Sequence, residues 1–274
     1  MISRRTVLGG VAGLGLSGCG GTPPKGATFD KAAAHPVTGP SAFGLDAVID
    51  ISHNVTVTDF AAVRRSKILA VIHKVTEGGD WFDPSYGSRR RQAEAAGLLW
   101  GGYHFGTRQY SGEQQAAAFL SACQPGPATV MALDLEPNDR NPRNTMTLAQ
   151  AEAFVLAVQR ATGRLPLLYG HPAWLDGERY GRRRLNLDRP VTPGSTLTRC
   201  ELWLADYREE PRIPVAWAQK GWRLWQYVAD ETAQNFAFGS EPRAVEGVGH
   251  CDRNVFKGDE ATLLRWWRAG GRLA

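Results

Sequence analysis

The chain has 274 residues, of which 43% are hydrophobic and 22% are charged, and its formal net charge is +5 at pH 7. This composition is typical of a globular protein with one large or two small domains, and no internal repeat is evident. Arg4 and Arg5 lie in an N-terminal leader, so the remaining chain carries about +3 (5 − 2). That excess is too small to indicate nucleic-acid binding, and no aromatic-plus-basic module suggests it.

The first nineteen residues, MISRRTVLGGVAGLGLSGC, have the pattern of an export signal. A positively charged start is followed by an apolar stretch too short to span a bilayer, and then by small residues before Cys19. SRRTVL resembles the twin-arginine export motif, and LSGC resembles a bacterial lipobox, whose cysteine is lipidated. We therefore expect residues 1–18 to be removed and Cys19 to anchor the protein to a membrane of the cell envelope, on the periplasmic or extracytoplasmic face.

Residues 19–43 are rich in Gly, Pro, Ala and Thr and lack apolar periodicity, which is typical of a flexible linker. The remaining residues, 44–274, are expected to form a single domain. An odd number of cysteines remains after Cys19, so they cannot all pair with one another. None has the spacing of metal ligands, and we expect buried thiols with one disulfide at most: Cys123, Cys200 and Cys251.

From Gly44 onward, strand-like and helix-like segments alternate along the chain. Apolar runs rich in β-branched residues predict strands over residues 45–51, 68–76, 98–106, 128–136 and 165–170. Start and stop signals predict helices between them, over residues 58–66, 83–97, 111–122 and 147–163. The last two of these helices open with the S/T-x-x-Q spacing of a capping box. Beyond residue 170 the helices fade, and we expect strands over 200–207, 222–228 and 246–256 and a closing helix over 259–270.

Consecutive βα units of this kind predict a parallel sheet. Eight strands within about 230 residues predict that the sheet closes into a barrel. We therefore expect an irregular parallel (β/α) barrel of the TIM type, with about five βα units followed by three strands with little helix. An open doubly wound sheet is the alternative, but no glycine-rich phosphate motif follows any strand.

Carboxylates stand at the expected carboxyl ends of five strands, where parallel barrels carry their catalytic groups. They are Asp50, Glu77, Asp134 with Glu136, Asp206 and Asp252. One such residue is readily explained as a solvated strand end. Carboxylates from five strands at one rim cost stability through mutual repulsion, which favours a functional site. Within VMALDLEPND, Asp134 and Glu136 are two positions apart and so point to the same face of their strand.

A rim rich in carboxylates can bind metal ions or catalyse the hydrolysis of glycosides. The histidines are scattered singly, without the spacing of a metal site, so no metal is expected. Flat aromatic side chains near the strand tips can stack on sugar rings and favour the glycoside interpretation, although each could instead belong to the core. These aromatic residues are Tyr103, Tyr169, Trp203, Tyr207, Trp225 and Tyr227.

The ordered set of motifs resembles the family 25 glycoside hydrolases, the Chalaropsis-type lysozymes that cleave peptidoglycan. The motifs run from about Asp46 to Phe256 as VIDIS, VIHKVTEG, GGYHF, LDLE, LYG, LWLADY, WQY and GHCDRNVF. The resemblance implies an irregular α/β barrel, no cofactor, and an N-acetylmuramidase that hydrolyses the β-1,4 bond between N-acetylmuramic acid and N-acetylglucosamine. It also implies peptidoglycan strands as the partner, and we expect a monomer.

By this resemblance, Glu136 is the general acid and Asp134 the second catalytic carboxylate. The acid of the first strand corresponds to Asp50, and the acid of the final D-x-N motif corresponds to Asp252. Further residues at the rim are expected to bind substrate: Glu77, Tyr103, Tyr169, Asp206, Tyr207 and Gln226. His53 and Cys251 depart from the family pattern, but neither change removes a catalytic carboxylate.

The spacing of the acid pair also bears on the reaction. Residues i and i+2 of a strand lie about 6.5 Å apart at Cα, which favours retention of configuration over inversion. The nucleophile is then either Asp134 or the acetamido oxygen of the substrate. A catalytically silent peptidoglycan-binding lipoprotein and a chitinase-like glycosidase remain alternative functions.

One segment outside these motifs is notable for its charge. GERYGRRRLNLDRP, residues 177–190, follows the fifth strand and is therefore expected at the rim of the barrel. A solvated loop is the simpler interpretation. The alternative is contact with an anionic wall polymer or with the carboxylates of peptidoglycan stem peptides.

Overall fold

The computed structural model describes residues 39–229 and 245–272. The expected export signal, the lipidated Cys19 and nearly all of the linker lie outside these residues. No helix within the described ranges is long and apolar enough to cross a membrane. Cys123 and Cys200 are free thiols and are buried.

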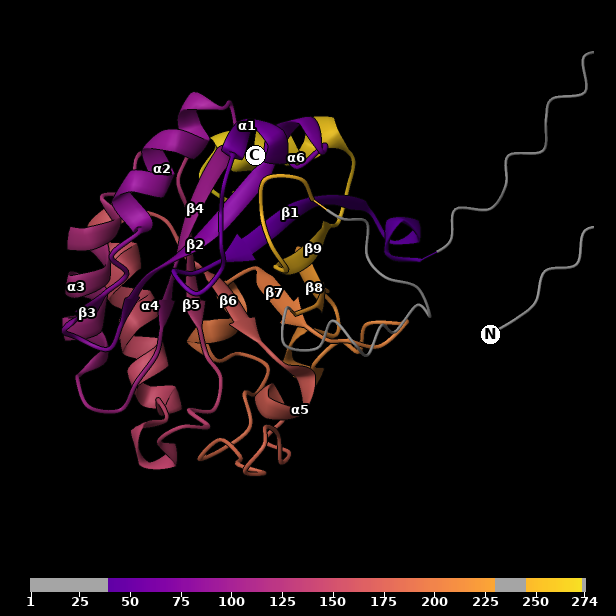
Figure 1. Cartoon of the computed structure of the whole chain (residues 1–274). Coiled ribbons are helices and arrows are strands. Elements are labelled where there is room, and N and C mark those ends of the chain that lie inside the picture. The colour runs from indigo at the N-terminus through magenta and orange to yellow at the C-terminus, as the bar shows by residue number, and fades with distance from the viewer. Residues whose placement is uncertain (1–38, 230–244, 273–274) are drawn as a thin grey trace, which may run out of the picture. The chain divides into compact units, whose positions relative to one another are not determined.

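Nine strands form one sheet, which closes on itself as an eight-strand barrel (Figure 1). The strands lie in the order β1-β9-β8-β7-β6-β5-β4-β2, and pairing of β1 with β2 completes the barrel. Their bounds are β1 Leu45–Ile51, β2 Ala70–Glu77, β4 Leu99–Phe105, β5 Val130–Asp134, β6 Leu167–Gly170, β7 Leu202–Ala205, β8 Leu224–Val228 and β9 Asp252–Phe256. The ninth strand, β3 (Trp81–Phe82), extends the sheet beside β2.

The expectation of a wholly parallel barrel was wrong for the last strand. β9 runs antiparallel to both of its neighbours, β1 and β8, whereas the other adjacent barrel strands are parallel. The register shows the reversal directly, with Trp225 of β8 opposite Val255 of β9 and Gln226 opposite Asn254 in an antiparallel ladder. The reversal brings the first residue of β9, Asp252, to the rim where its neighbours end, opposite Asp50 of β1.

Helices lie between the strands of the first half, as the sequence predicted. They are α1 Phe60–Arg65, α2 Tyr86–Ala95, α3 Gly112–Cys123 and α4 Leu148–Thr162, followed by the short α5 Pro172–Leu175 and the closing α6 Glu260–Arg268. Both predicted capping boxes are formed, with Ser111 and Gln114 on α3 and Thr147 and Gln150 on α4. Single-turn 3-10 helices occupy 40–42, 142–144, 196–199 and 215–217.

Two apolar layers divide the core according to the alternation of the strands. On β5, Val130 and Ala132 belong to a cluster that fills the barrel and reaches α6. The intervening Met131 and Leu133 belong to a second cluster, which packs the barrel against α3 and α4. This alternation points Asp134, the next residue in the inward series, into the barrel mouth.

A bulge in β2 adjusts this alternation near the rim. The register against β4 shifts between Lys74 and Thr76, so that one residue of β2 is extra. Val75 and Thr76 are both buried outside the barrel, and Thr76 bonds to the His104 ring there at 2.8 Å. Lys74 and Glu77 consequently share the inner face.

Candidate active site

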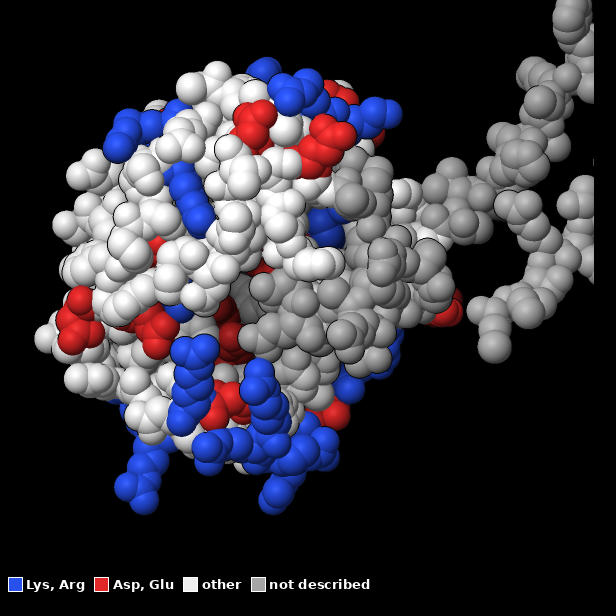
Figure 2. All heavy atoms as spheres, viewed as in Figure 1, with Lys and Arg blue, Asp and Glu red and all other residues white. Residues whose placement is uncertain are grey.

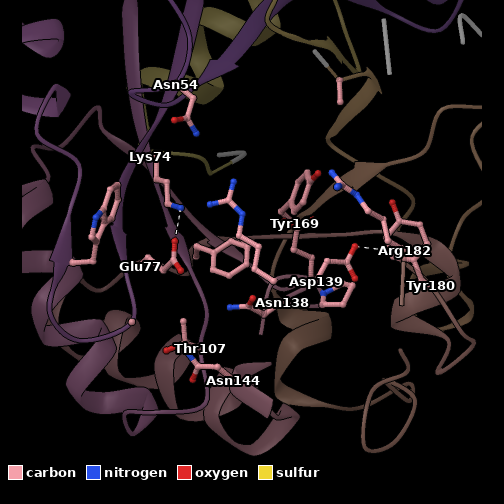
Figure 3. Close-up of a pocket in the computed structure, with 18 of the residues that line it drawn as sticks. Asn54, Lys74, Glu77, Thr107, Asn138, Asp139, Asn144, Tyr169, Tyr180 and Arg182 are labelled. Atoms are coloured by element: carbon pink, nitrogen blue, oxygen red, sulfur yellow. Dashed lines mark hydrogen bonds and ion pairs between the residues drawn. The ribbon is translucent and has the colours of Figure 1, made fainter. Parts of the chain in front are cut away.

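A cavity of about 1100 Å³ opens at the mouth of the barrel (Figure 3). Its lining includes most of the residues that the sequence singled out as site residues. Six of them line it directly: Glu77, Glu136, Tyr169, Tyr207, Gln226 and Asp252. Figure 3 shows Lys74 and Glu77 on one wall, with Tyr180 and Arg182 on the opposite side.

Asp134 and Glu136 leave β5 on the same side of the chain, because the intervening Leu135 is buried in the outer apolar cluster. Glu136 lines the cavity and is partly exposed, whereas Asp134 lies deeper and is only 7% exposed. One carboxylate oxygen of Asp134, Oδ1, is buried and accepts no hydrogen bond from the described residues. A buried carboxylate oxygen without a donor lowers stability.

The electrostatic surroundings of Asp134 act in both directions. Burial raises the pKa of Asp134 well above its usual range, and the nearby charge of Glu136 raises it further. The Lys74 ammonium opposes this and favours the ionised form. The acid pair therefore retains a proton at a pH where exposed carboxylates have lost theirs.

On the opposite side of the mouth, Asp50 and Asp252 are held by amide donors. The Gln226 Nε2 group donates to both oxygens of Asp50, at 3.1 and 3.0 Å, and to Asp252 Oδ2 at 3.2 Å. Asn254 donates a further hydrogen bond to Asp50 Oδ2 at 2.7 Å. These bonds fix the two carboxylates in place.

Gln226 is also bonded at its other end. Its Oε1 atom accepts hydrogen bonds from the phenols of Tyr169 at 2.8 Å and Tyr207 at 3.0 Å. Because the carboxylates can only accept when ionised, and phenols donate readily, the network itself determines which end of the amide carries the nitrogen. Gln226 is 2% exposed and links both tyrosines to both carboxylates.

Lys74 supplies a cation inside this acidic mouth. Its ammonium lies 2.7 Å from Glu77 Oε2, and it also lies over the rings of Trp81 and Phe105, at 5.0 and 4.9 Å from their centroids. The ion pair and the two ring contacts hold the ammonium in one position. The β2 bulge makes this arrangement possible, because it places Lys74 and Glu77 on the same face.

The predicted tyrosines differ in depth. Tyr169 and Tyr207 line the cavity, and Tyr103 lies behind them with its ring against Trp203, at 6.2 Å between centroids. Burial raises the pKa of all three phenols, and the charge of Asp134 is the next cause for Tyr103. The phenols therefore stay protonated and act as hydrogen-bond donors in this site.

Asp206 is the predicted site residue that the structure places elsewhere. It is 1% exposed, does not line the cavity, and forms an ion pair with Arg208 at 2.6 Å. It also accepts a hydrogen bond from the Arg212 backbone N–H at 2.7 Å. Asp206 follows Ala205, which faces the barrel interior, so the alternation of the chain directs Asp206 away from the mouth. It orders the following loop.

The histidines are separate from the acid cluster. His104 is buried outside the barrel, stacked on Phe154 at 4.8 Å and bonded to Gln115 and Thr76. Burial lowers the pKa of His104 to about 4, so it is neutral near pH 7. His53 does line the cavity, with its ring on Asp83 at 3.1 Å. No group of three or more His, Cys, Asp or Glu side chains within residues 39–229 and 245–272 is arranged to hold a metal ion.

Some residues that line the cavity or support its walls were not assigned to the site from the sequence. Lys74 belongs to the VIHKVTEG motif near the end of β2, and the bulge turns it inward together with Glu77. Asn254 belongs to the D-x-N motif, and its contact with Asp50 depends on the antiparallel β9. Others come from loops: Arg140, and four residues of the insert over 177–190, which the sequence placed at the rim without assigning its residues to the site, namely Arg179, Tyr180, Arg182 and Arg184.

Comparison with known proteins places this geometry in a family. The model of glycosyl hydrolases family 25 matches residues 49–236, which is more than half of the chain. An N,O-diacetylmuramidase from Chalaropsis sp. is 31% identical over 138 residues, and the aligned part covers 46% of this chain and 65% of that protein. The match thus spans slightly less than two thirds of the relative's length.

Solved structures agree with the fold. The bacterial lysozyme from Streptomyces coelicolor superposes with a TM-score of 0.65 at 23% identity, over 84% of this chain and 99% of the other, and this likeness concerns the fold. A family 25 lysozyme from Aspergillus fumigatus has a TM-score of 0.60 at 26% identity, over 82% and 98% of the two chains. On the strength of the family match, the chain belongs to the family 25 glycoside hydrolases.

Proposed function

We propose that this protein is a muramidase, which hydrolyses the β-1,4 bond between N-acetylmuramic acid and N-acetylglucosamine in peptidoglycan. The observation that carries the proposal is the pair of carboxylates at the end of β5, in a cavity large enough for several sugar units. Family membership and the muramidase relative support the choice of substrate.

Glu136 is assigned as the general acid. It is the member of the pair that lines the cavity, so it can reach a glycosidic oxygen bound there. The pair retains a proton because burial and mutual repulsion oppose a second ionisation, and the Lys74 cation favours the charged form of Asp134. With Asp134 ionised, that proton resides on Glu136, from which it passes to the leaving oxygen as the glycosidic bond breaks.

Asp134 is assigned the role of orienting and stabilising the substrate's acetamido group. Asp134 is 7% exposed at the base of the mouth, and its carboxylate can accept a hydrogen bond there from an acetamido N–H. In that arrangement the acetamido oxygen attacks the anomeric carbon and forms an oxazolinium ring, while Asp134 stabilises the positive charge on the acetamido group. Water then attacks the anomeric carbon and opens the oxazolinium ring, so that the configuration is retained. Direct attack by Asp134 is the competing mechanism, and a sugar ester on Asp134 detected by mass spectrometry would establish it.

Asp50 and Asp252 are assigned to the stabilisation of positive charge in the transition state. Gln226 and Asn254 hold Asp50 before the substrate binds, so little rearrangement is needed during the reaction. Tyr169 and Tyr207 line the sugar-binding surface while they hold the Gln226 amide in place.

The test is digestion of purified sacculi by the wild type and by Glu136→Gln, with identification of the new reducing ends. The proposal predicts muramic acid at those ends, formed by the wild type and reduced roughly 100- to 10,000-fold in the variant. Glucosamine ends would indicate a different glycosidase, and binding without cleavage would indicate a silent binding protein. Glu152→Gln, a change on α4 outside the cavity, is the matched control.

We also propose that the protein is exported and anchored through Cys19, because residues 1–19 combine a twin-arginine-like motif with a lipobox. Cys19→Ser is expected to move the protein from the membrane fraction to the soluble fraction. Equal membrane association of both forms would contradict the lipid anchor.

A further inference from the structure

Three arginines stand at the edge of the cavity, and we refer to them as the cationic rim: Arg140, Arg179 and Arg184. Arg140 follows β5, and the other two belong to the insert over residues 177–190. All three are exposed and line the same cavity as Glu136. Figure 2 shows Lys and Arg side chains gathered along the edge of a hollow in which Asp and Glu side chains lie.

The insert is fastened to the loop that follows β5. Asp139 accepts a hydrogen bond from the Arg182 backbone N–H at 2.9 Å, and its carbonyl accepts one from Arg183 Nε at 2.8 Å. Gly181 has a φ of 81°, and a Cβ there would lie 2.8 Å from Asp139 Oδ1, so this close approach requires glycine. The two segments that carry the rim are therefore linked directly to each other.

A second contact holds the base of the insert. The Tyr180 ring stacks on His171 at 3.8 Å between centroids, and Tyr180 pairs with Leu185 in an isolated bridge. Arg179 and Arg184 stand immediately beside this pair in the chain. The position of their backbone is thus fixed, which distinguishes the segment from a freely solvated loop.

The charges of the rim are not neutralised within the part of the chain that the structure describes. No described carboxylate forms an ion pair with Arg140, Arg179 or Arg184. Other arginines of this region do have carboxylate partners, namely Arg189 with Glu152, Arg208 with Asp206, and Arg212 with Asp176 and Glu178. The rim therefore presents three positive charges to whatever occupies the cavity.

The proposed substrate determines which anion can reach this rim. The sugar rings are uncharged, and the lactyl carboxylate of muramic acid is consumed in the amide bond to the stem peptide. The free carboxylates of peptidoglycan are therefore on the stem peptide, which projects from the sugar next to the scissile bond. Guanidinium groups bind carboxylates with charge-assisted, bidentate hydrogen bonds.

We propose that the cationic rim binds the carboxylates of the stem peptide on the glycan strand being cleaved. This inference rests on the proposed muramidase function and specifies its substrate: glycan that carries peptides with free carboxylates. The rim lies on the cavity itself, which favours a group attached to the bound sugar over a separate wall polymer.

The test compares two preparations of soluble peptidoglycan fragments, both with acetylated amines. In one, the stem-peptide carboxylates are free; in the other, they have been converted to primary amides with carbodiimide and ammonia. Three proteins are assayed for kcat/KM: the wild type, the rim variant Arg140→Ala/Arg179→Ala/Arg184→Ala, and a control variant Arg91→Ala/Arg160→Ala/Arg268→Ala. The control arginines are exposed on α2, α4 and α6 and do not line the cavity. Their replacement removes the same total charge as the rim variant.

The wild type and the control are expected to cleave the carboxylate form about tenfold faster than the amidated form. The rim variant is expected to cleave both forms at the rate of the wild type on the amidated form. Added salt should narrow the wild-type preference, since it screens exposed charges. A melting temperature equal to that of the wild type establishes that the rim variant is folded.

Two outcomes of the kcat/KM comparison would overturn the inference. One is an equal loss by the rim variant on both preparations, and the other is no preference by the wild type. If the rim variant instead lost only its binding to a phosphate-bearing wall polymer, the partner would be that polymer and the inference would be wrong. If the proposed muramidase function is wrong, the wild type cleaves neither form. Cleavage of the amidated form by the wild type therefore distinguishes a wrong inference about the rim from a wrong function.

Discussion

The buried carboxylates on the two sides of the barrel mouth differ in their hydrogen-bond donors. On the side of β8, β9 and β1, Asp50 accepts three hydrogen bonds from Gln226 and Asn254. On the β5 side, Asp134 is equally buried, but its Oδ1 has no donor among the described residues, and burial raises its pKa. The first side is a completed network that stabilises its own geometry. The second lowers stability and leaves a strong acceptor for the substrate.

Replacement of Asp134 tests this difference with the largest expected effect. Asp134→Asn should lower kcat roughly 100- to 1000-fold, because the amide cannot stabilise positive charge in the same way. The folded protein retains a proton on the Asp134–Glu136 pair that the unfolded chain releases, so the pair makes stability fall as the pH rises above about 3.9.

The variant should therefore gain stability relative to the wild type between pH 4 and pH 7, as measured by urea unfolding. A variant that is less stable than the wild type at both pH values would contradict the assignment of Asp134 as a strained, functional carboxylate.

Replacement of Gln226 tests the hydrogen-bond network on the side of β8, β9 and β1. Gln226→Met keeps the approximate volume but removes the donor of Asp50 and Asp252 and the acceptor of Tyr169 and Tyr207. We expect the free energy of unfolding to fall by about 2–4 kcal/mol, because buried polar groups lose their partners. Chemical denaturation measures this, and a change below about 0.5 kcal/mol would show that the network contributes little.

A histidine on the outer face of β4 sharpens the comparison, because its pH dependence has the opposite sign. Burial lowers the pKa of His104 to about 4, so the unfolded chain binds its proton first as the pH falls. The stability that neutral His104 contributes is complete above about pH 6.5 and is lost toward pH 4, by up to about 3 kcal/mol. The difference in unfolding free energy between the wild type and His104→Gln should shrink over this interval, and a constant difference would contradict the assigned shift.

The smallest effect on activity is expected at Asp206. This carboxylate is bonded to Arg208 and to the Arg212 backbone, away from the cavity. Asp206→Asn should lower stability by about 1–2 kcal/mol while changing KM for peptidoglycan fragments less than about twofold. A large rise in KM at unchanged stability would return Asp206 to the substrate-binding residues.

The sequence predicted the barrel, its eight strands and six of the residues that line the cavity. Periodicity and helix caps locate elements well, as the capping boxes of α3 and α4 show. The direction of β9 was not predictable, because alternation in a five-residue strand is the same in both directions. Asp252 nevertheless lies at the expected rim, since reversal of β9 brings its first residue there.

The failures at the site have a common physical cause. Whether a residue at a strand end faces the mouth depends on one position of register. Asp206 lies one residue away from the inward series, and Lys74 and Glu77 share a face only because of the bulge between them. The role of Gln226 depends on contacts with four side chains distant in sequence, and composition and spacing do not encode such contacts.

The division of roles between the two β5 carboxylates can be measured with a substrate that needs no acid. One such substrate is the N-acetylglucosaminyl-N-acetylmuramic acid disaccharide that carries a 4-methylumbelliferyl group. This group is a good leaving group and departs without protonation. Glu136→Gln should lose roughly 1000-fold in kcat/KM on peptidoglycan fragments but less than about tenfold on this glycoside, whereas Asp134→Asn should lose activity on both. Equal losses by Glu136→Gln on the two substrates would contradict its assignment as the proton donor.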